Sequence, residues 1–226
     1  MIAQPHTVRE FLTPDAFAEA FSVSRETVER LKTYESLLQQ WQKTINLVAP
    51  STLNQVWHRH FADSAQLVRL APPAPKTWVD LGSGGGFPGL AVAILLAATQ
   101  NTEKTKFTLI ESDSRKAAFL REVARAVAVP VDILPVRIEA AATRASVRGA
   151  AVISARALSP LTRLFAQAAP FMTAGSVGLF PKGREVSREL QAAENEWIFD
   201  CELVPSLTDT EAKIAVIRNL SPKSPA

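Results

Sequence analysis

Short apolar runs alternate with longer amphipathic segments from residue 77 onward. The apolar runs predict strands at 77–81, 107–110, 131–136, 151–154, 176–180, 198–204 and 214–218. The segments between most of them predict helices at 88–98, 114–128, 160–170 and 184–196. Such alternation is typical of an α/β fold, a mostly parallel sheet with helices on both faces. Residues 205–213, between the last two runs, are too few for a crossover helix, so we expect a C-terminal antiparallel hairpin.

The residues before this pattern predict helices. Thr13-Pro14-Asp15 supplies a hydroxyl N-cap, a proline at the first helical position and an acid in the first turn. A second helix is expected after Ser24, and its apolar stripe packs against the main domain through Val28, Leu31, Leu38, Trp41 and Ile45. Residues 46–67 predict a loop and then a helix. Because the proline-rich stretch 71–75 predicts a boundary, we expect a helical extension over residues 1–70 and a seven-stranded, Rossmann-like domain over residues 76–220.

The composition of the chain excludes some classes of protein but does not indicate a function. A chain of 226 residues, 47% hydrophobic and 21% charged, suits one medium-sized globular domain. It contains no apolar run of the roughly 18 residues that a membrane span needs, and its N-terminus does not resemble a secretory signal, so we expect a cytoplasmic protein with no membrane partner. The single cysteine, Cys201, excludes an internal disulfide framework and is expected to be buried within its strand. A net charge of +3 permits nucleic-acid binding without indicating it.

Five glycines between Gly82 and Gly89 directly follow the first predicted strand. Open α/β sheets bind ligands at the carboxyl ends of their strands, and glycine lets a ligand approach the main chain. Pro88 is expected at the first position of the following helix. Residues 84–89 match the G-x-G-x-x-G pattern of dinucleotide sites, but so glycine-rich a stretch satisfies most spacings.

The stretch from Asp80 to Gly86 instead matches the pattern of S-adenosylmethionine sites, an acid followed after one residue by G-x-G-x-G. A carboxylate suits this cofactor, which carries an ammonium and a sulfonium, and disfavours a pyrophosphate. We therefore favour S-adenosylmethionine as the cofactor, with S-adenosylhomocysteine as its product. The expected ligands in this turn are Asp80, Gly82, Gly84 and Gly86.

Two further stretches extend this cofactor site. Glu111 ends the second strand, where a carboxylate accepts hydrogen bonds from both ribose hydroxyls. Ile138, after the third strand, is expected to pack on the adenine base. Glu139 or a backbone amide is expected at the edge of the base, although Glu139 in this position also suits a helix cap.

The fourth strand, which normally faces the methyl acceptor, ends in Ile153-Ser154-Ala155-Arg156-Ala157-Leu158. It lacks the Asn/Asp-Pro-Pro-aromatic stretch of adenine amino methylation, and Cys201 is an unsuitable place for a cytosine nucleophile. An acceptor with its own lone pair, such as guanine N7, needs no general base. Direct in-line transfer to it, without a covalent intermediate, would depend mainly on alignment of the reacting atoms.

Several motifs, in order, resemble those of the RsmG (GidB) family of bacterial methyltransferases: NLVA (46–49), RHFADS (59–64), VDLGSGGGFPG (79–89), LIESDSRKAAFLREV (109–123), VRIE (136–139), ISARAL (153–158) and FPKGR (180–184). The resemblance covers roughly residues 40–185. It implies methylation of guanine N7 in the decoding-region loop of 16S rRNA. It also implies donor-binding roles for Gly82, Phe87, Ile138, Glu139 and Arg156. The stretch IESDSRKAAFL departs from the family's usual order of basic residues, so the resemblance does not indicate which cation there contacts RNA.

Basic residues near predicted strand ends and on one predicted helix suit phosphate contacts, and binding through them would be salt-dependent. The RNA-binding candidates are Arg59, Arg115, Lys116, Arg121, Arg137, Lys182 and Arg184, with Arg125 on the same helix. Arg156 and Lys182, at the ends of the fourth and fifth strands, are also candidates for positioning the acceptor. His58, His60 and Asp63 lack a further ligand candidate and are expected to orient structure rather than to bind metal.

The expected partner is 16S rRNA, in the small ribosomal subunit or its assembly intermediate, and the expected state is a monomer. Three alternatives remain open at this point. The first is a methyltransferase that acts on a small molecule or a protein, and the second is a nicotinamide-dependent oxidoreductase. The third is a donor-binding RNA assembly factor without catalytic activity.

Overall fold

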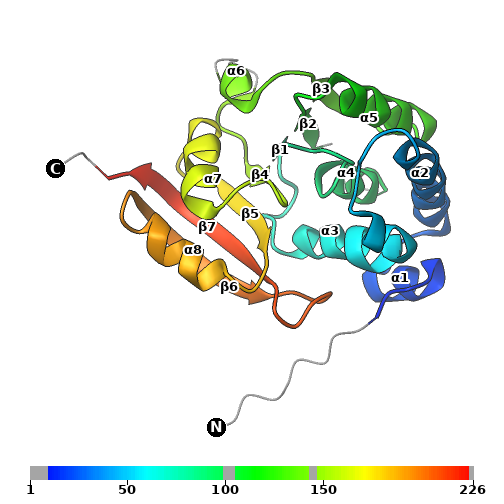
Figure 1. Ribbon diagram of the computed structural model, residues 1–226, viewed down its shortest axis with the longest axis horizontal. Coiled ribbons are helices and arrows are strands. Elements are labelled where there is room, and N and C mark those ends of the chain that lie inside the picture. Colours follow the sequence, from blue (N-terminus) through cyan, green and yellow to red (C-terminus); the bar gives the residue numbers. More distant parts are fainter. Residues whose placement is uncertain (1–9, 99–104, 143–146, 224–226) are drawn as a thin grey trace, which may run out of the picture.

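The computed structural model describes residues 10–98, 105–142 and 147–223. Within these residues one sheet has seven strands in the order β3-β2-β1-β4-β5-β7-β6 (Figure 1). The strands are β1 Thr77–Leu81, β2 Lys106–Ile110, β3 Asp132–Leu134, β4 Val152–Ser154, β5 Val177–Lys182, β6 Trp197–Pro205 and β7 Lys213–Pro222. Strands β1 to β5 are parallel, whereas β7 is antiparallel to both β5 and β6. The predicted mostly parallel sheet with a C-terminal antiparallel hairpin is therefore confirmed.

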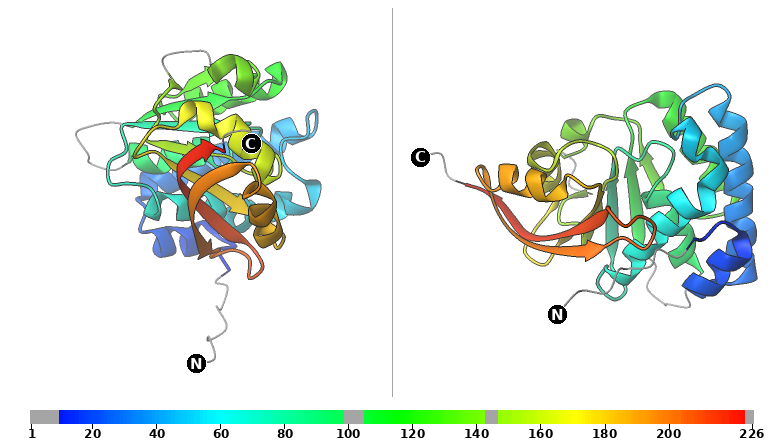
Figure 2. Two further views of the ribbon diagram at one scale, coloured as in Figure 1. Left: turned by 90° about the vertical axis from the view of Figure 1, so that its left-hand side faces the viewer. Right: turned by 60° about the horizontal axis from the view of Figure 1, so that its bottom comes forward.

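Alternate residues of the strands contribute to two hydrophobic cores, one on each face of the sheet. Trp78 and Phe107 point into the core beneath α4 and α5, whereas Val79 and Ile110 point into the core beneath α6, α7 and α8. The helices are α4 Gly89–Ala97, α5 Ser114–Ala126, α6 Ile138–Ala142, α7 Leu161–Ala168 and α8 Val186–Ala193. Figure 2 shows the long β6–β7 hairpin curving out beside α8.

The N-terminal residues form helices α1 (Pro14–Phe21) and α2 (Arg25–Gln42), which begin at the predicted caps. The side chains of Thr13 and Ser24 accept hydrogen bonds from the first turns of these helices. Helix α2 packs on α4 and α5. Helix α4 is apolar on all sides, so it must be buried on more than one side. The sheet covers one side of it, and α2 with its neighbours covers another. The N-terminal helices thus share one hydrophobic core with the sheet, while residues 1–9 of the predicted extension lie outside the described residues.

The segment between α2 and β1, predicted as a loop and a helix, is a chain of short helical elements. These are the 3₁₀ helix η1 (Pro50–Gln55), the π-helical turn η2 (Trp57–Ala62), α3 (Asp63–Ala65) and the 3₁₀ helix η3 (Gln66–Arg69). Figure 1 shows this segment beside α4, at the edge that faces β5 and the β6–β7 loop. π-Helical turns are rare and recur at functional sites.

Several local predictions were wrong. Helix α7 ends earlier than predicted, at Ala168, and a 3₁₀ turn that contains Pro170 follows it. Pro88 occupies the N-cap of α4 rather than its first position, after a cis peptide bond from Phe87. Cys201 is exposed rather than buried, because β6 is the outermost strand and pairs with β7 alone within the described residues.

Among the helices of the described residues, none combines the length and the apolar character that a membrane span requires.

Candidate functional site

A cleft of ≈ 1040 Å³ opens at the carboxyl ends of β1, β2, β4 and β5. Eleven of the predicted site residues line it: Arg59, Gly82, Gly84, Phe87, Glu111, Lys116, Arg137, Ile138, Glu139, Arg156 and Lys182. The predicted residues Asp80, Gly86, Arg115, Arg121 and Arg184 do not line it. We call the turn Gly82–Phe87, of which Gly86 does not line the cleft, together with Glu111 and Ile138 the glycine wall. The pairs Arg59–Asp209, Asp63–Arg156 and Lys182–Glu189, which also line the cleft, form the ion-pair wall, and Arg156 lies against Phe87 of the glycine wall.

The glycines of the turn have two different structural roles. Gly82, Gly84 and Gly86 have φ values of +65°, +54° and +90°, which side chains disfavour. A Cβ at Gly84 would meet only the oxygen of Gly82, at 3.8 Å, whereas a Cβ at Gly86 would overlap the hydroxyl of Tyr34. Gly84 therefore leaves bare backbone facing the cleft, and Gly86 allows the turn to pack on α2.

Asp80 lies beneath the turn and is fully buried. Its Oδ1 accepts a hydrogen bond of 2.6 Å from Ser154 Oγ, and its Oδ2 has no hydrogen-bond partner within the described residues. Burial raises the pKa of Asp80 from 3.8 to about 6, against the opposing effect of the Ser154 hydrogen bond. A Cβ at Gly89 would lie 2.5 Å from Asp80 Cβ, so glycine is needed there for packing. Asp80 therefore packs beneath the turn and does not line the cleft.

Glu111 fixes the outer edge of the glycine wall. Its Oε2 accepts a hydrogen bond of 2.8 Å from the Gly84 amide, and its Oε1 accepts one of 2.7 Å from the Asp113 amide. The side chain is 8% exposed and faces the cleft. Nearby, Ile138 is buried at the start of α6 and Glu139 is exposed, and both line the cleft. The sequence predicted the position of Glu111 but not its hydrogen bond to the turn.

Phe87 is the centre of an aromatic stack below the cleft. Its ring lies parallel to that of Tyr34, with centroids 5.2 Å apart, and 4.8 Å from the His60 ring. The Arg156 guanidinium carbon lies 5.4 Å from the Phe87 centroid, a cation–π contact. Tyr34 is fully buried and its hydroxyl donates to the Gly85 carbonyl, so α2 supports the turn directly. Tyr34 was not among the residues predicted from the sequence, although its spacing from Leu31 and Leu38 places it on the predicted stripe.

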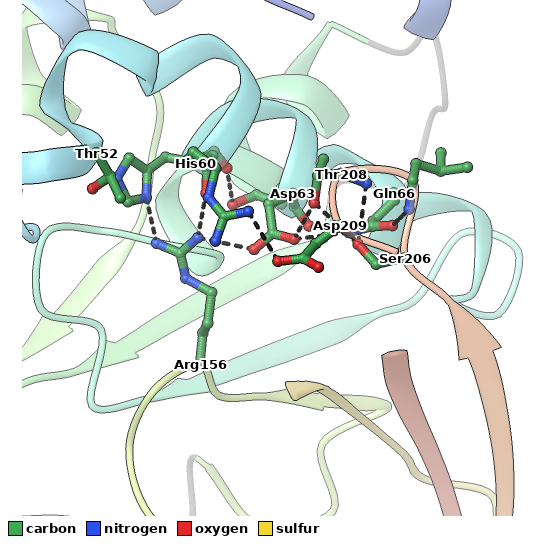
Figure 3. Close-up of polar contacts among 11 residues, drawn as sticks. Thr52, His60, Asp63, Gln66, Arg156, Ser206, Thr208 and Asp209 are labelled. Atoms are coloured by element: carbon green, nitrogen blue, oxygen red, sulfur yellow. Dashed lines mark hydrogen bonds and ion pairs between the residues drawn. The ribbon is translucent and has the colours of Figure 1, made fainter. Parts of the chain in front are cut away.

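Arg156 is held by one helical turn of the ion-pair wall (Figure 3). Its Nη1 donates to the Arg59 carbonyl and to Asp63 Oδ2, both at 2.9 Å, and its Nη2 donates to His60 Nδ1 at 2.7 Å. Burial and the charges of Arg156 and Arg59 lower the pKa of His60 to about 3, so the ring is neutral at physiological pH. Within the described residues no cluster of three His, Cys, Asp or Glu side chains is arranged to hold a metal.

The remaining basic residues fall into two groups. Lys182 Nζ lies 2.6 Å from Glu189 Oε2 and donates to the Ser159 carbonyl at 3.0 Å, and Arg59 pairs with Asp209 at 3.2 Å. The acidic partners Glu189 and Asp209 were not predicted, and neither was Arg163, which also lines the cleft. Of the basic residues named from the sequence, Arg115, Arg121, Arg125 and Arg184 are exposed and lie outside the cleft lining.

Comparisons with known proteins agree on one family. The family model described as "GidB: rRNA small subunit methyltransferase G" matches residues 27–219. A relative from Parvibaculum lavamentivorans, named "Ribosomal RNA small subunit methyltransferase G", is 48% identical over 91% of this chain and 89% of its own. A protein of the same name from Methylobacterium sp. is 49% identical over 92% of this chain and 95% of its own.

Solved structures with low sequence identity support the fold. An O-methyltransferase from Bacillus cereus, in complex with SAH, has a TM-score of 0.59 at 10% identity and covers 91% of this chain and 96% of its own. A TehB-like SAM-dependent methyltransferase from Corynebacterium glutamicum has a TM-score of 0.53 at 11% identity, covering 83% and 98%. The fold is thus the predicted Rossmann-like fold of S-adenosylmethionine-dependent methyltransferases. The chain belongs to the GidB family of small-subunit rRNA methyltransferases.

Proposed function

We propose that this protein transfers a methyl group from S-adenosylmethionine to N7 of a guanosine in the decoding-region loop of 16S rRNA, in the cytoplasm. The observation that carries the proposal is one cleft lined by both the glycine wall and the ion-pair wall. Membership of the GidB family and the names of the relatives support the same substrate class. Family membership and the names of the relatives both disfavour a nicotinamide-dependent oxidoreductase.

The glycine wall fits the donor. Gly82 and Gly84 present backbone without side chains, Glu111 presents a buried carboxylate, and Ile138 presents an apolar surface suited to a nucleobase. The buried carboxylate of Asp80 beneath the turn, which has no salt bridge within the described residues, favours a cationic ligand over a pyrophosphate. When bound, S-adenosylmethionine supplies a methyl group on a positively charged sulfur. The residues Gly82, Gly84, Phe87, Glu111, Ile138, Glu139 and Arg156 would hold it.

The ion-pair wall suits an acceptor that needs no general base. Within the described residues, the acids of this wall are each paired with a cation: Asp63 with Arg156, Glu189 with Lys182, and Asp209 with Arg59. Each of these carboxylates lies against a cation, so the structure uses it to orient that cation rather than leaving it free to meet the acceptor. Guanine N7 has a free lone pair and carries no proton. The task left to Arg156 and Lys182 is to orient the acceptor.

Cys201 gives no support to a covalent mechanism. It is exposed on β6 and does not line the cleft. We therefore propose direct in-line transfer without an enzyme-bound intermediate.

RNA would reach the cleft through its basic rim. Arg59, Lys116, Arg137 and Lys182 line the cleft, and the exposed side chains of Arg115, Arg121 and Arg184 are available for more distant phosphates. Because A-form RNA hides N7 in a deep and narrow groove, we expect the target guanosine to be in a loop or splayed out of its stack.

The proposed function is tested with small ribosomal subunits from a strain that lacks this enzyme. Incubation with the protein and labelled S-adenosylmethionine should label one guanosine of 16S rRNA at N7. Labelling of a small molecule or a protein instead, with none in rRNA, would refute the proposed substrate. Binding of S-adenosylhomocysteine and of rRNA without any methylated product would indicate a non-catalytic assembly factor.

A further inference from the structure

The guanidinium of Arg156 is oriented by acceptors from a single helical turn. Two of its three bonds use Nη1, to the Arg59 carbonyl and Asp63 Oδ2, and the third uses Nη2, to His60 Nδ1. An arginine has five N–H donors, two on each Nη and one on Nε. Within the described residues, Nε–H and one Nη2–H have no hydrogen-bond partner, so two donors remain for a molecule in the cleft that Arg156 lines.

The protonation of His60 is set by its neighbours. Thr52 Oγ1 donates to the Ala49 carbonyl at 2.8 Å, so towards His60 Nε2, also at 2.8 Å, it acts as the acceptor. The His60 proton therefore lies on Nε2, and Nδ1 accepts from Arg156. A neutral imidazole orients the guanidinium but supplies no negative charge to balance it.

Asp63 supplies that charge, and its second oxygen is held by the β6–β7 loop. Asp63 Oδ1 accepts hydrogen bonds from Gln66 Nε2 at 2.9 Å and Thr208 Oγ1 at 3.0 Å. Gln66 Oε1 accepts from the Leu207 amide, and Gln66 Nε2 also donates to Ser206 Oγ. Figure 3 shows Asp63 between Arg156 on one side and Thr208 with Gln66 on the other. A buried polar network with its members satisfied rigidifies the groups that it connects.

We propose that Asp63 is a positioning residue that acts through Arg156, holding the guanidinium with its two free donors available to the reactants. This inference rests on the proposed function. The side chains of Asp63 and Arg156 are 16% and 18% exposed, so their pairing is only weakly screened by solvent. Removal of the carboxylate leaves a mostly buried cation without its charged partner, free to leave the Phe87 ring and turn towards solvent.

Asp63→Asn and Thr208→Val separate positioning from simple structural support. The first substitution removes the charge beside Arg156, and the second removes the Thr208 hydrogen bond to the same carboxylate but leaves the ion pair. We expect D63N to slow single-turnover methyl transfer to small subunits about ten- to a hundredfold, and T208V to slow it less than about threefold. If D63N does not unfold cooperatively on heating, Asp63→Ser is used in its place. Serine also removes the charge, and unlike asparagine it places no amide N–H beside the Arg156 guanidinium.

A double-mutant cycle tests whether the effect passes through Arg156. In an Arg156→Gln background, D63N should slow transfer by less than about threefold, because the group that Asp63 positions is already absent. Equal slowing by D63N in both backgrounds, or equal slowing by D63N and T208V, would overturn the proposal.

An NMR measurement decides the same point without reference to the substrate. In protein labelled with ¹⁵N-arginine, the Nε–H resonance of Arg156, assigned by its loss in Arg156→Lys, should report a rigid side chain in the wild type and T208V. The side chain should become mobile in D63N. An equally rigid Arg156 in D63N would overturn the positioning role. If the wild type methylates no rRNA, the proposed function fails, and this measurement still decides the role of Asp63.

Discussion

The two walls of the cleft use their acidic residues in opposite ways. Beneath and along the glycine wall, Asp80 and Glu111 have no salt-bridge partner within the described residues and bond only to neutral donors. On the ion-pair wall, Asp63, Glu189 and Asp209 each bind a cation. In the first arrangement the carboxylates remain able to attract a cationic ligand. In the second, each carboxylate is already in a salt bridge and orients the cation of the protein that it contacts. Under the proposed function, the glycine wall binds the donor through complementary charge and bare backbone, and the ion-pair wall binds the acceptor through side chains fixed in advance.

The largest expected effect is a loss of stability at one glycine of the glycine wall, Gly86, that is not shared by its neighbour Gly84. Gly86→Ala places a Cβ against the Tyr34 hydroxyl at positive φ, and we expect a loss of about 3 kcal/mol or more of unfolding free energy. The Cβ of Gly84→Ala makes only an ordinary contact with the Gly82 oxygen, at 3.8 Å, and its positive φ should cost only about 1 kcal/mol, yet its methyl group should weaken binding of S-adenosylhomocysteine. Urea unfolding and calorimetry measure the two effects. Similar stability of both variants would contradict the two roles assigned to these glycines.

Asp80→Asn tests the buried carboxylate under the glycine wall. Because the folded-state pKa of about 6 lies above the ordinary 3.8, the folded protein binds more protons than the unfolded chain, and stability falls as pH rises between these values. The shift corresponds to about 3 kcal/mol. The unfolding free energy of Asp80→Asn relative to wild type should therefore rise by about 3 kcal/mol between roughly pH 4 and pH 7. A pH-independent difference in urea unfolding would show that Asp80 titrates normally.

Glu111→Ala should weaken S-adenosylhomocysteine affinity about ten- to a hundredfold, since hydrogen bonds to a charged group contribute about 1.5–3 kcal/mol each. The lost hydrogen bond to the Gly84 amide adds to this effect. Glu111→Gln keeps one carbonyl acceptor and should lose less. Calorimetry measures both variants, and wild-type affinity in Glu111→Ala would remove this residue from the donor site.

Lys182→Ala tests the ion-pair wall, and of these substitutions it is expected to change the affinity for the donor least. We expect unchanged S-adenosylhomocysteine affinity and methyl transfer about tenfold slower, because the acceptor loses one positioning cation. Arg184→Ala, an exposed neighbour outside the cleft lining, is the control for general phosphate attraction and should reduce rRNA affinity only slightly. If Lys182→Ala lost donor binding and transfer equally, the distinction between the two walls would fail at this residue.

The sequence predicted the glycine wall more fully than the ion-pair wall. The glycine turn, Glu111 and Ile138 each follow a strand that an apolar run identifies, so periodicity alone places them at one edge of the sheet. The contacts of Asp63 with Thr208 join residues 145 positions apart, and no local pattern predicts them. The exposure of Cys201 was mispredicted because the order of strands in the sheet, not the apolar run, makes β6 an edge.

The sequence by itself determined the alternation of strands and helices, the final hairpin and the glycine turn, because these depend on local periodicity, chain length and backbone freedom. Only the tertiary structure decided which glycine faces the cleft, that Tyr34 of α2 supports the turn, and that Arg156 is held by His60 and Asp63. Those features depend on burial and on distances between segments far apart in the chain. Burial and distance set the strength of charge interactions, and both arise only when the chain has folded.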